Sequence, residues 1–497
     1  MIHELYSMAL PNEKEKTLLY YRCLGNVQRK ENLFFFLSEN SELELSTYFN
    51  SFSLEKWKQY TTIKQLFLKG IVVGFFRVEV YGVSADTEQV VKSYLVTSNF
   101  ELSLDIKNLS YEILYVKFIA EKAESILYSF SYYGLFDSWE NVNINGIICT
   151  YCREKYVQKN IHILKAFKQR EKWFSLTVID NGQTLTEQNE DGFQIIHNLN
   201  YGGSAGFTRG IIESLHKMSL DYILLMDDDI EFDVMILKKT HALLCGLKTS
   251  LKESFLSGAM LNMGSPCTQY ENTAYWNVIK GISVGHNLDL SKKRSLTINE
   301  KKRIKENQYA AWWYCCIPIE RVKQIGLPLP IFIKGDDLEY SIRNAREIMT
   351  LNGIAVWHEE FQKKNSLWVQ YLADRNMMMM NFFVKRGTKS GLLLAVTLRL
   401  FRRMIDLKKV SLLVFACSLS DLIKGLSYIA EYGGNKAYID TVVSNVHEKS
   451  ILHILKNIVK NSMILFKKYK VIRKDYLNFR NQNLKKSDFW KNYLGIN

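Results

Sequence analysis

The sequence has little of what marks disordered, fibrous or disulfide-stapled chains. Its 497 residues include only 5 prolines and 26 glycines and no low-complexity tract, which excludes collagen-like and largely disordered proteins. The eight cysteines are scattered, and the one C-x-x-C, Cys149 to Cys152, has neither a second pair nor a histidine at zinc spacing. We therefore expect reduced, mostly buried thiols in a chain long enough for several domains.

The sequence also shows no segment of the kind that directs a chain into or across a membrane. The first residues lack the basic start and apolar stretch of a secretory signal, so we expect a cytoplasmic protein. No window reaches the ~18 to 20 uninterrupted apolar residues of a membrane span, because the nearest runs, 391–398 and 410–418, are short and flanked by Arg and Lys. The sequence thus predicts a protein that does not cross a membrane.

Positive charge is concentrated in one part of the chain. Residues 381–497 hold 22 Lys and Arg against 7 Asp and Glu, so they carry all of the net charge of +14. A basic segment mixed with Leu, Ile, Phe and Tyr can bind nucleic acid or anionic lipid headgroups, and a solvated helical face is the third interpretation. No recognised nucleic-acid module accompanies the charge, so we expect no nucleic-acid partner.

The hydrophobic pattern changes twice along the chain and predicts three domains. Short alternating runs in residues 1–143 are typical of an antiparallel sandwich. From 144 to 370, short apolar runs alternate with helical stretches, which is the pattern of a parallel sheet with crossover helices. Residues 371–497 read as amphipathic helices. We expect a multi-domain α/β protein with an N-terminal β-sandwich, a central Rossmann-like domain and a basic helical C-terminal domain.

The strongest local signal is an Asp triplet, Asp227–Asp229, directly after the apolar run 222–226. Ligands of open α/β sheets bind beyond the carboxyl ends of the strands. Three adjacent carboxylates repel one another unless a cation is present, and hard divalent ions accept carboxylate and phosphate oxygens together. The triplet therefore suggests a metal that bridges to a nucleotide diphosphate, with a helix N-cap as the alternative.

A glycine-rich segment, 198–210, follows a predicted strand and opens a predicted helix. Glycines let a backbone approach a ligand, and a helix N-terminus favours anionic groups. The spacing G-G-x-x-G does not match the dinucleotide fingerprint G-x-G-x-x-G. A nucleotide-side loop and a tight strand-to-helix connection both remain open interpretations.

Two further motifs carry candidate chemistry in the second half of the central domain. The pair Asp336-Asp337 enters a helix after an apolar run, so one carboxylate could serve as a general base, or both could simply cap the helix. His358 could complete a metal shell, although such a residue is more often a hydrogen-bonded core histidine. Trp312 and Trp313 could stack on sugar rings or fill the core.

The order of these pieces (Asp-Asp-Asp, the Trp pair, Asp-Asp-x-Glu-Tyr, then Trp-His) resembles the inverting GT-A glycosyltransferases, and within them the bacterial galactofuranosyltransferases. The segment 47–52, TYFNSF, followed by Trp57, resembles the opening of that family's N-terminal sandwich. The resemblance covers about residues 40 to 375. It departs at Gly335, where the family usually has Trp before the paired Asp, and the C-terminal domain looks shorter than in polymerising members.

The resemblance implies a role for each motif. Asp227, Asp229 and His358 would hold Mn²⁺ or Mg²⁺, and Asp337 would be the general base with Asp336 beside it. Trp312 and Trp313 would line the sugar and acceptor side. The UDP pocket would contain Thr150, Arg153, Asp180, Asn200, Arg209 and Asp228.

The expected activity follows from the same resemblance. Galactofuranose would pass from UDP-galactofuranose to a hydroxyl of a lipid-linked surface glycan of the capsule, O-antigen or cell-wall galactan type. The basic C-terminal domain would bind the anionic inner face of the plasma membrane. The alternatives are a GT-A enzyme that uses another nucleotide sugar, such as dTDP-rhamnose or UDP-galactopyranose, and an inactive glycan-binding protein.

Overall fold

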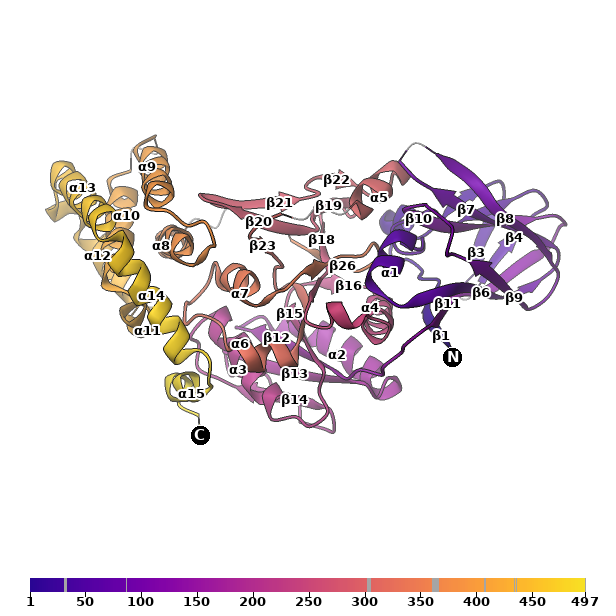
Figure 1. Ribbon diagram of the computed structural model, residues 1–497, viewed down its shortest axis with the longest axis horizontal. Coiled ribbons are helices and arrows are strands. Elements are labelled where there is room, and N and C mark those ends of the chain that lie inside the picture. Colours follow the sequence, from indigo (N-terminus) through magenta and orange to yellow (C-terminus); the bar gives the residue numbers. More distant parts are fainter. Residues whose placement is uncertain are drawn as a thin grey trace.

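The structure, a computed structural model, shows an elongated molecule with three parts in a row (Figure 1). A β-sandwich lies at one end, helices lie at the other, and a mixed α/β domain lies between them. The described residues are 1–30, 34–85, 87–301, 305–359, 366–405, 408–432, 434 and 436–496.

The N-terminal part is a sandwich of two antiparallel sheets. Alternate side chains point into it, as in β6, where Leu66 and Leu68 are buried and Ile71 is exposed. One sheet has the order β3 (Val27–Lys30), β4 (Phe34–Leu37), β11 (Ser125–Phe136), β6 (Ile63–Val73), β9 (Phe100–Asp105), with β1 (Ile2–Ser7) also paired to β11. The other has the order β2 (Arg22–Leu24), β5 (Glu42–Glu44), β10 (Ile113–Ala120), β7 (Phe76–Val83), β8 (Glu88–Val96).

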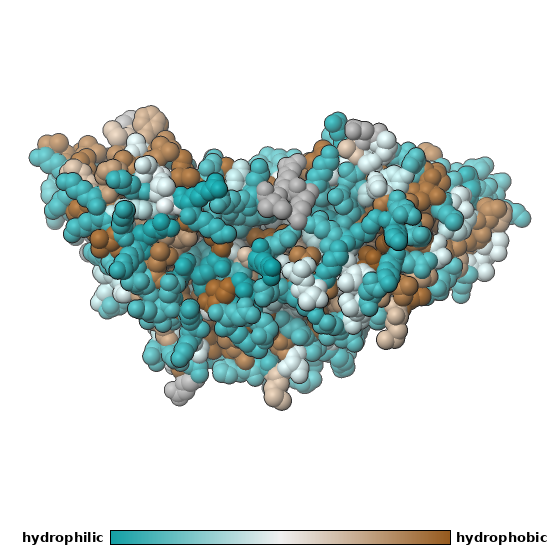
Figure 2. Space-filling model, viewed as in Figure 1, coloured by the Kyte–Doolittle hydropathy of each residue, from teal (hydrophilic) through white to brown (hydrophobic). Residues whose placement is uncertain are grey.

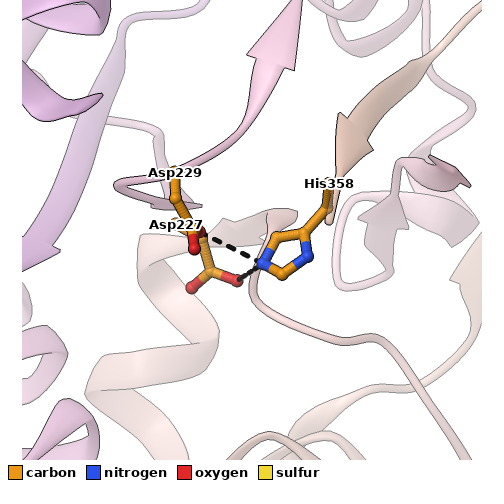
Figure 3. A group of neighbouring side chains, drawn as sticks. All are labelled: Asp227, Asp229 and His358. Atoms are coloured by element: carbon orange, nitrogen blue, oxygen red, sulfur yellow. Dashed lines mark ion pairs between the residues drawn. The ribbon is translucent and has the colours of Figure 1, made fainter. Parts of the chain in front are cut away.

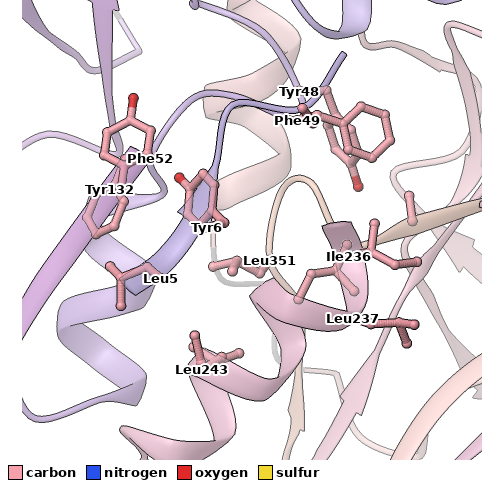
Figure 4. Packing of buried hydrophobic residues seen from close by; sticks show 14 of the residues in the cluster. Leu5, Tyr6, Tyr48, Phe49, Phe52, Tyr132, Ile236, Leu237, Leu243 and Leu351 are labelled. Atoms are coloured by element: carbon pink, nitrogen blue, oxygen red, sulfur yellow. The ribbon is translucent and has the colours of Figure 1, made fainter. Parts of the chain in front are cut away.

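The segment 47–52 joins the sandwich to the central domain. The Asn50 amide accepts a hydrogen bond from the Ala9 N–H and donates to the Ala9 and Tyr20 carbonyls. The ammonium of Lys239 on α4 (Met235–Cys245) donates to the Phe49 carbonyl at 2.8 Å. Figure 4 shows the apolar contact, in which sandwich residues lie against α4 and the loop before β26 (Ala355–His358): Leu5, Tyr6, Tyr48, Phe49, Phe52, Tyr132, Ile236, Leu237, Leu243 and Leu351. The segment 47–52 is therefore part of the hydrophobic core between the sandwich and the central domain.

The main sheet of the central domain has parallel strands covered by helices. Its strands are almost continuously apolar because both faces are buried, as in β15, where all residues before Asp227 are buried. The order is β14 (Phe193–His197), β13 (Phe174–Asp180), β12 (Ile144–Thr150), β15 (Tyr222–Asp227), β24 (Tyr314–Pro318), β17 (Phe255–Ser257), β25 (Ile348–Met349), with β24 antiparallel to its neighbours. The helices are α2 (Glu154–Arg170), α3 (Gly203–Leu215), α4 and α6 (Ile319–Ile325), and α1 (Leu54–Tyr60) precedes them in the sandwich.

Two smaller sheets extend the central domain on the side of the carboxyl strand ends. One has the order β16 (Glu231–Phe232), β26 (Ala355–His358), β18 (Ala259–Asn262), β19 (Thr268–Glu271), β22 (Leu288–Asp289). The other consists of β21 (Lys280–Val284), β20 (Thr273–Asn277) and β23 (Gln308–Tyr309). Helices α5 (Lys293–Glu300) and α7 (Asp336–Asn344) accompany them.

The C-terminal part is helical and docks on the central domain. Arg480 on α14 pairs with the buried Glu339 of α7 at 3.1 Å, and the Trp490 indole donates to the Pro328 carbonyl. Of the helices that the structure describes, none is both long and apolar enough to span a bilayer. The helices are α8 (Leu367–Phe383), α9 (Lys389–Ile405), α10 (Lys409–Lys424), α11 (Leu426–Tyr432), α12 (Lys436–Ser444), α13 (Ile451–Lys467), α14 (Tyr469–Asn483) and α15 (Asp488–Leu494).

These three parts confirm the predicted fold class. The first predicted boundary falls just before β12, which begins at Ile144, whereas α8 runs continuously across the second one at 370/371. The domain limits themselves stay predictions. The eight cysteines are free, as expected, but only Cys245, Cys315 and Cys316 are buried, so the expectation of mostly buried thiols is wrong.

Candidate active site

Three predicted metal ligands lie together at the carboxyl end of β15 (Figure 3). One ligand atom from each of Asp227, Asp229 and His358 lies within 4.8 Å of the others. The His358 Nε2 is 3.1 Å from an Asp229 oxygen and 3.9 Å from an Asp227 oxygen. The register explains the meeting, because β16 directly follows the Asp triplet and pairs with β26, whose last residue is His358.

The chemistry of this group suits a divalent cation. Burial, against the opposing charge of His358 and together with the charges of Asp229 and Asp228, raises the pKa of Asp227 to about 7. Burial opposes a charge on His358, yet its hydrogen bond to Asp229 and the charge of Asp227 raise its pKa to about 9. The ring's Nδ1 faces the Glu359 carbonyl, which leaves Nε2 for the carboxylates. Two carboxylates and an imidazole with excess negative charge fit Mn²⁺ or Mg²⁺.

The middle residue of the triplet has other partners. The Thr150 hydroxyl donates to Asp228 at 2.7 Å, and Arg153 donates to Asp228 at 3.2 Å and also to Asp229. Thr150 ends β12, the strand beside β15, and Arg153 is the N-cap residue of α2, the helix that follows β12. The predicted residues Thr150, Arg153 and Asp228 are thus brought together. Their contact with a nucleotide stays a prediction.

The glycine-rich segment seats α3 against the sheet. A Cβ at Gly206 would lie 2.1 Å from the Cys149 sulfur, and one at Gly202, where φ is 89°, would lie 2.1 Å from the Phe332 carbonyl oxygen. The close packing agrees with a tight strand-to-helix connection. It also places the loop beside the chain that leads to Asp336, so the two interpretations are compatible.

The remaining predicted nucleotide residues have structural partners. Asp180 is fully buried and accepts hydrogen bonds from the backbone N–H groups of residues 182, 184 and 185, so it shapes its own loop. Asn200 accepts from the Gly202 N–H at 3.0 Å, and Arg209 pairs with Glu213 at 2.8 Å along α3. A role for Asp180, Asn200 and Arg209 in binding UDP stays a prediction.

The paired carboxylates Asp336 and Asp337 begin α7. Gly335 is the residue before the helix and has φ 99°, a left-handed conformation that favours glycine. This backbone conformation favours Gly over Trp at position 335, and because Gly335 is the N-cap, neither Asp is. Burial raises the pKa of Asp337, and burial together with the charge of Asp337 raises the pKa of Asp336, while Lys334 opposes both shifts.

The carboxylates from separate motifs converge. The charge of Asp337 contributes to the raised pKa of Asp227. After burial, the charges of Asp228, Asp227, Asp336 and, last, Asp180 raise the pKa of the Cys149 thiol, so this thiol lies among them. The metal-type group and the candidate base thus belong to one site.

Two further residues of this site have no sequence signal. Burial, and after it the charge of Asp337, raise the pKa of Glu271 on β19 to about 7. Tyr309 on β23 has a raised pKa from burial and, next, from Asp337. No motif surrounds either residue, since a strand rather than a motif brings each one to Asp337.

The two tryptophans, Trp312 and Trp313, are largely buried. Each is only 5% exposed, and the Trp313 indole donates to the Gly258 carbonyl at 2.9 Å. Trp312 packs edge-on against Phe207 and Tyr340. Both side chains pack in the core, and a role for them in binding the sugar or the acceptor stays a prediction.

Comparison with known proteins gives relatives in one family. Residues 12–123 match the family described as galactofuranosyltransferase 2 N-terminal. Galactofuranosyltransferase GlfT2 of Mycobacterium tuberculosis is 25% identical over 380 residues, which are 69% of this chain and 58% of that protein. GlfT2 of Mycolicibacterium smegmatis is 23% identical over 426 residues, 78% of this chain and 65% of that protein. The resemblance to galactofuranosyltransferases is confirmed.

The likeness to galactofuranosyltransferases extends beyond the sandwich, because 380 aligned residues exceed the length of that part. The chain spans roughly six tenths of the length of these curated relatives, 58% and 65%. Among solved structures, residues 1–349 of S. aureus TarS align with a TM-score of 0.36 and 14% identity, covering 66% of this chain and 92% of that one.

Proposed function

We propose that this protein is a metal-dependent, inverting galactofuranosyltransferase that uses UDP-galactofuranose. The observation that supports this most is the convergence of Asp227, Asp229 and His358 with the Asp336-Asp337 pair at one end of the sheet. A donor diphosphate needs a cation, and an acceptor hydroxyl needs a base. The site offers candidates for both. The similarity to galactofuranosyltransferases supports galactofuranose as the transferred sugar.

The reaction is a single displacement at C1 of the donor sugar. Asp337 takes the proton of the acceptor hydroxyl as the oxygen forms a bond to C1, while the bond from C1 to the diphosphate breaks and UDP leaves. Because attack comes from the face opposite the leaving group, the configuration at C1 inverts. A bound divalent cation would neutralise the charge that develops on the diphosphate. Arg153 and Thr150 donate hydrogen bonds to Asp228, and Asp227, Asp229 and His358 are the residues that would hold the cation.

The acceptor and location belong to the same proposal. The acceptor is a lipid-linked bacterial surface glycan, and the protein works at the inner face of the plasma membrane, where its C-terminal helices meet anionic lipid. The excess of basic residues after 381 supports this part.

We expect the donor to be discriminated by its ring form. A polar pocket leaves groups unpaired when a sugar of the wrong shape enters, at about 1 to 3 kcal/mol for each group. Turnover with UDP-galactofuranose should exceed turnover with UDP-galactopyranose at least about tenfold, given an acceptor that ends in galactose. UDP release measured with a panel of nucleotide sugars tests this. Better use of dTDP-rhamnose or of the pyranose would favour the alternative donor and leave the base and metal assignments standing.

The pH profile should show a base with a raised pKa. An Asp with an ordinary pKa of about 4 would remain active in mild acid. Burial raises the pKa of Asp337 to about 6 and that of Asp336 to about 7. Activity should therefore be full above this range and fall as pH drops through 6 to 7. The measurement is kcat/KM at saturating metal at each pH, and an acid limb near pH 4 would argue against this base.

A further inference from the structure

An apolar groove lies between α9 and α13 in the C-terminal domain. It has a volume of about 290 Å³. Its floor is buried, as at Val396 and Ile458, and its rim is exposed, as at Leu393, Val459 and Met463. The lining residues are Leu393, Val396, Thr397, Leu400, Ile458, Val459, Ser462, Met463, Phe466 and Lys467.

A basic groove of about 970 Å³ adjoins it along α13 and α14. Phe466 and Lys467 line both grooves, so the two are continuous. Among the residues that line the basic groove, five are cationic and none is acidic. The cationic residues are Lys389, Lys467, Lys470, Arg473 and Lys474.

The cations of this groove do not all have the same task. Arg473 donates to the carbonyls of Phe382, Val384 and Gly387, so it ties α14 to the end of α8. The Lys389 ammonium lies 4.5 Å from the centre of the Phe466 ring. Lys467 and Lys470 are exposed at the mouth of the groove, where an anion can reach them.

The helix surfaces around the two grooves are also both basic and apolar. Helices α9 and α13 contain seven Lys and Arg and no Asp or Glu. Their exposed side chains include many large apolar groups, and this end of the molecule shows brown patches in Figure 2. These exposed residues are Leu393, Leu394, Leu398, Phe401, Met404, Ile405, Ile451, Leu452, Val459, Met463 and Phe466. Contiguous apolar surface of this kind marks an interaction site.

From these two grooves we infer a binding site for a membrane lipid with a phosphate headgroup. The hydrocarbon chain lies in the apolar groove, and the phosphate meets Lys467 and Lys470 in the basic one. Charge complementarity favours this occupant over a second copy of the chain, because two copies would bring positive surfaces together. A polynucleotide has no long apolar chain for the first groove. This inference rests on one part of the proposed function, the binding of the C-terminal helices to anionic membrane lipid, and it names the residues that bind the lipid.

Vesicle co-sedimentation of the full chain tests the site with point variants. A truncation is unsuitable, because it would leave the buried Glu339 without Arg480. The probes are vesicles of phosphatidylcholine containing phosphatidylglycerol. The apolar variant is Val459→Asn with Met463→Gln, and the charge variant is Lys467→Glu with Lys470→Glu; all four positions are exposed. Each should bind at least tenfold more weakly than the parent, and binding should weaken with salt, which screens charges over about 8 to 10 Å.

Matched controls lie at the far end of the molecule. Leu24→Gln with Leu95→Gln changes two exposed apolar residues of the sandwich, and Lys92→Glu with Lys107→Glu changes two exposed lysines there. Both control proteins should bind vesicles like the parent. Transfer to a water-soluble acceptor should be unchanged in the apolar and the charge variant, so failure of the lipid site is distinguishable from failure of the proposed reaction.

Four results would overturn the inference. Parental vesicle binding by the apolar variant would show that the groove takes no lipid chain. Equal binding to vesicles in which oleate replaces phosphatidylglycerol would show attraction to charge without phosphate recognition. Displacement by free glycerol phosphate in excess would indicate a soluble ligand. If the variants lost self-association and kept parental vesicle binding, this face would be an interface between two copies of the chain.

Discussion

Asp229→Ala should abolish transfer, with turnover at least about 10³-fold below the parent, because a metal contributes several kcal/mol at a leaving diphosphate. The change removes one of three ligands and also a partner of His358 and Arg153. Chelator should have the same effect on the parent, and added Mn²⁺ or Mg²⁺ should restore only the parent. The measurement is UDP release under initial-rate conditions.

The control for this prediction is Asp137→Ala. Asp137 is a solvent-exposed carboxylate on the sandwich side, paired with Lys64. It should leave turnover unchanged. Thermal unfolding of both variants separates a lost site from a lost fold. Full turnover of the parent in chelator would exclude the metal assignment.

Asp337→Asn should lower kcat by about 10² to 10⁴, the usual contribution of a general base. The amide keeps the shape of the side chain but cannot accept the proton. Affinity for UDP should change little, because the residue acts on the acceptor. The measurements are kcat with a galactose-terminated acceptor and UDP binding by calorimetry.

Asp336→Asn is the matched comparison, because it removes the neighbouring carboxylate and leaves Asp337 in place. We expect a smaller loss of kcat than in Asp337→Asn, because Asp337 can still accept the proton. If the Asp337→Asn protein keeps more than half of its activity, the base lies elsewhere and Asp336 is the next candidate.

The parts of the fold that sequence could predict depend on local patterns. Alternating residues in β6 through β11 give the sandwich, and the apolar run before Asp227 gives the central strand with carboxylates at its end. Each of these patterns is local, because it spans only a few neighbouring residues. The order of strands and the packing of the C-terminal helices on α7 depend on contacts between distant segments, and no local pattern carries them.

The same distinction applies to the site. His358 is far from the Asp triplet in sequence, and the pairing of β16 with β26 brings it there. No local pattern therefore predicts that it is a metal ligand, and only the family resemblance implies this role. In sequence, Trp312 and Trp313 could either stack on a sugar or fill the core, because their burial depends on residues that are distant along the chain. Glu271 and Tyr309 reach Asp337 from strands without any motif. Long-range placement therefore limits prediction more than residue chemistry does.

The most direct test of the central claim is the configuration of the product. The purified protein is incubated with UDP-galactofuranose, a galactose-terminated acceptor and Mn²⁺ or Mg²⁺, and the new linkage is examined by NMR spectroscopy. We predict a galactofuranosyl product whose configuration at C1 is opposite to that of the donor, formed only when metal is present. A product with retained configuration, or no transfer from this donor, would contradict the account.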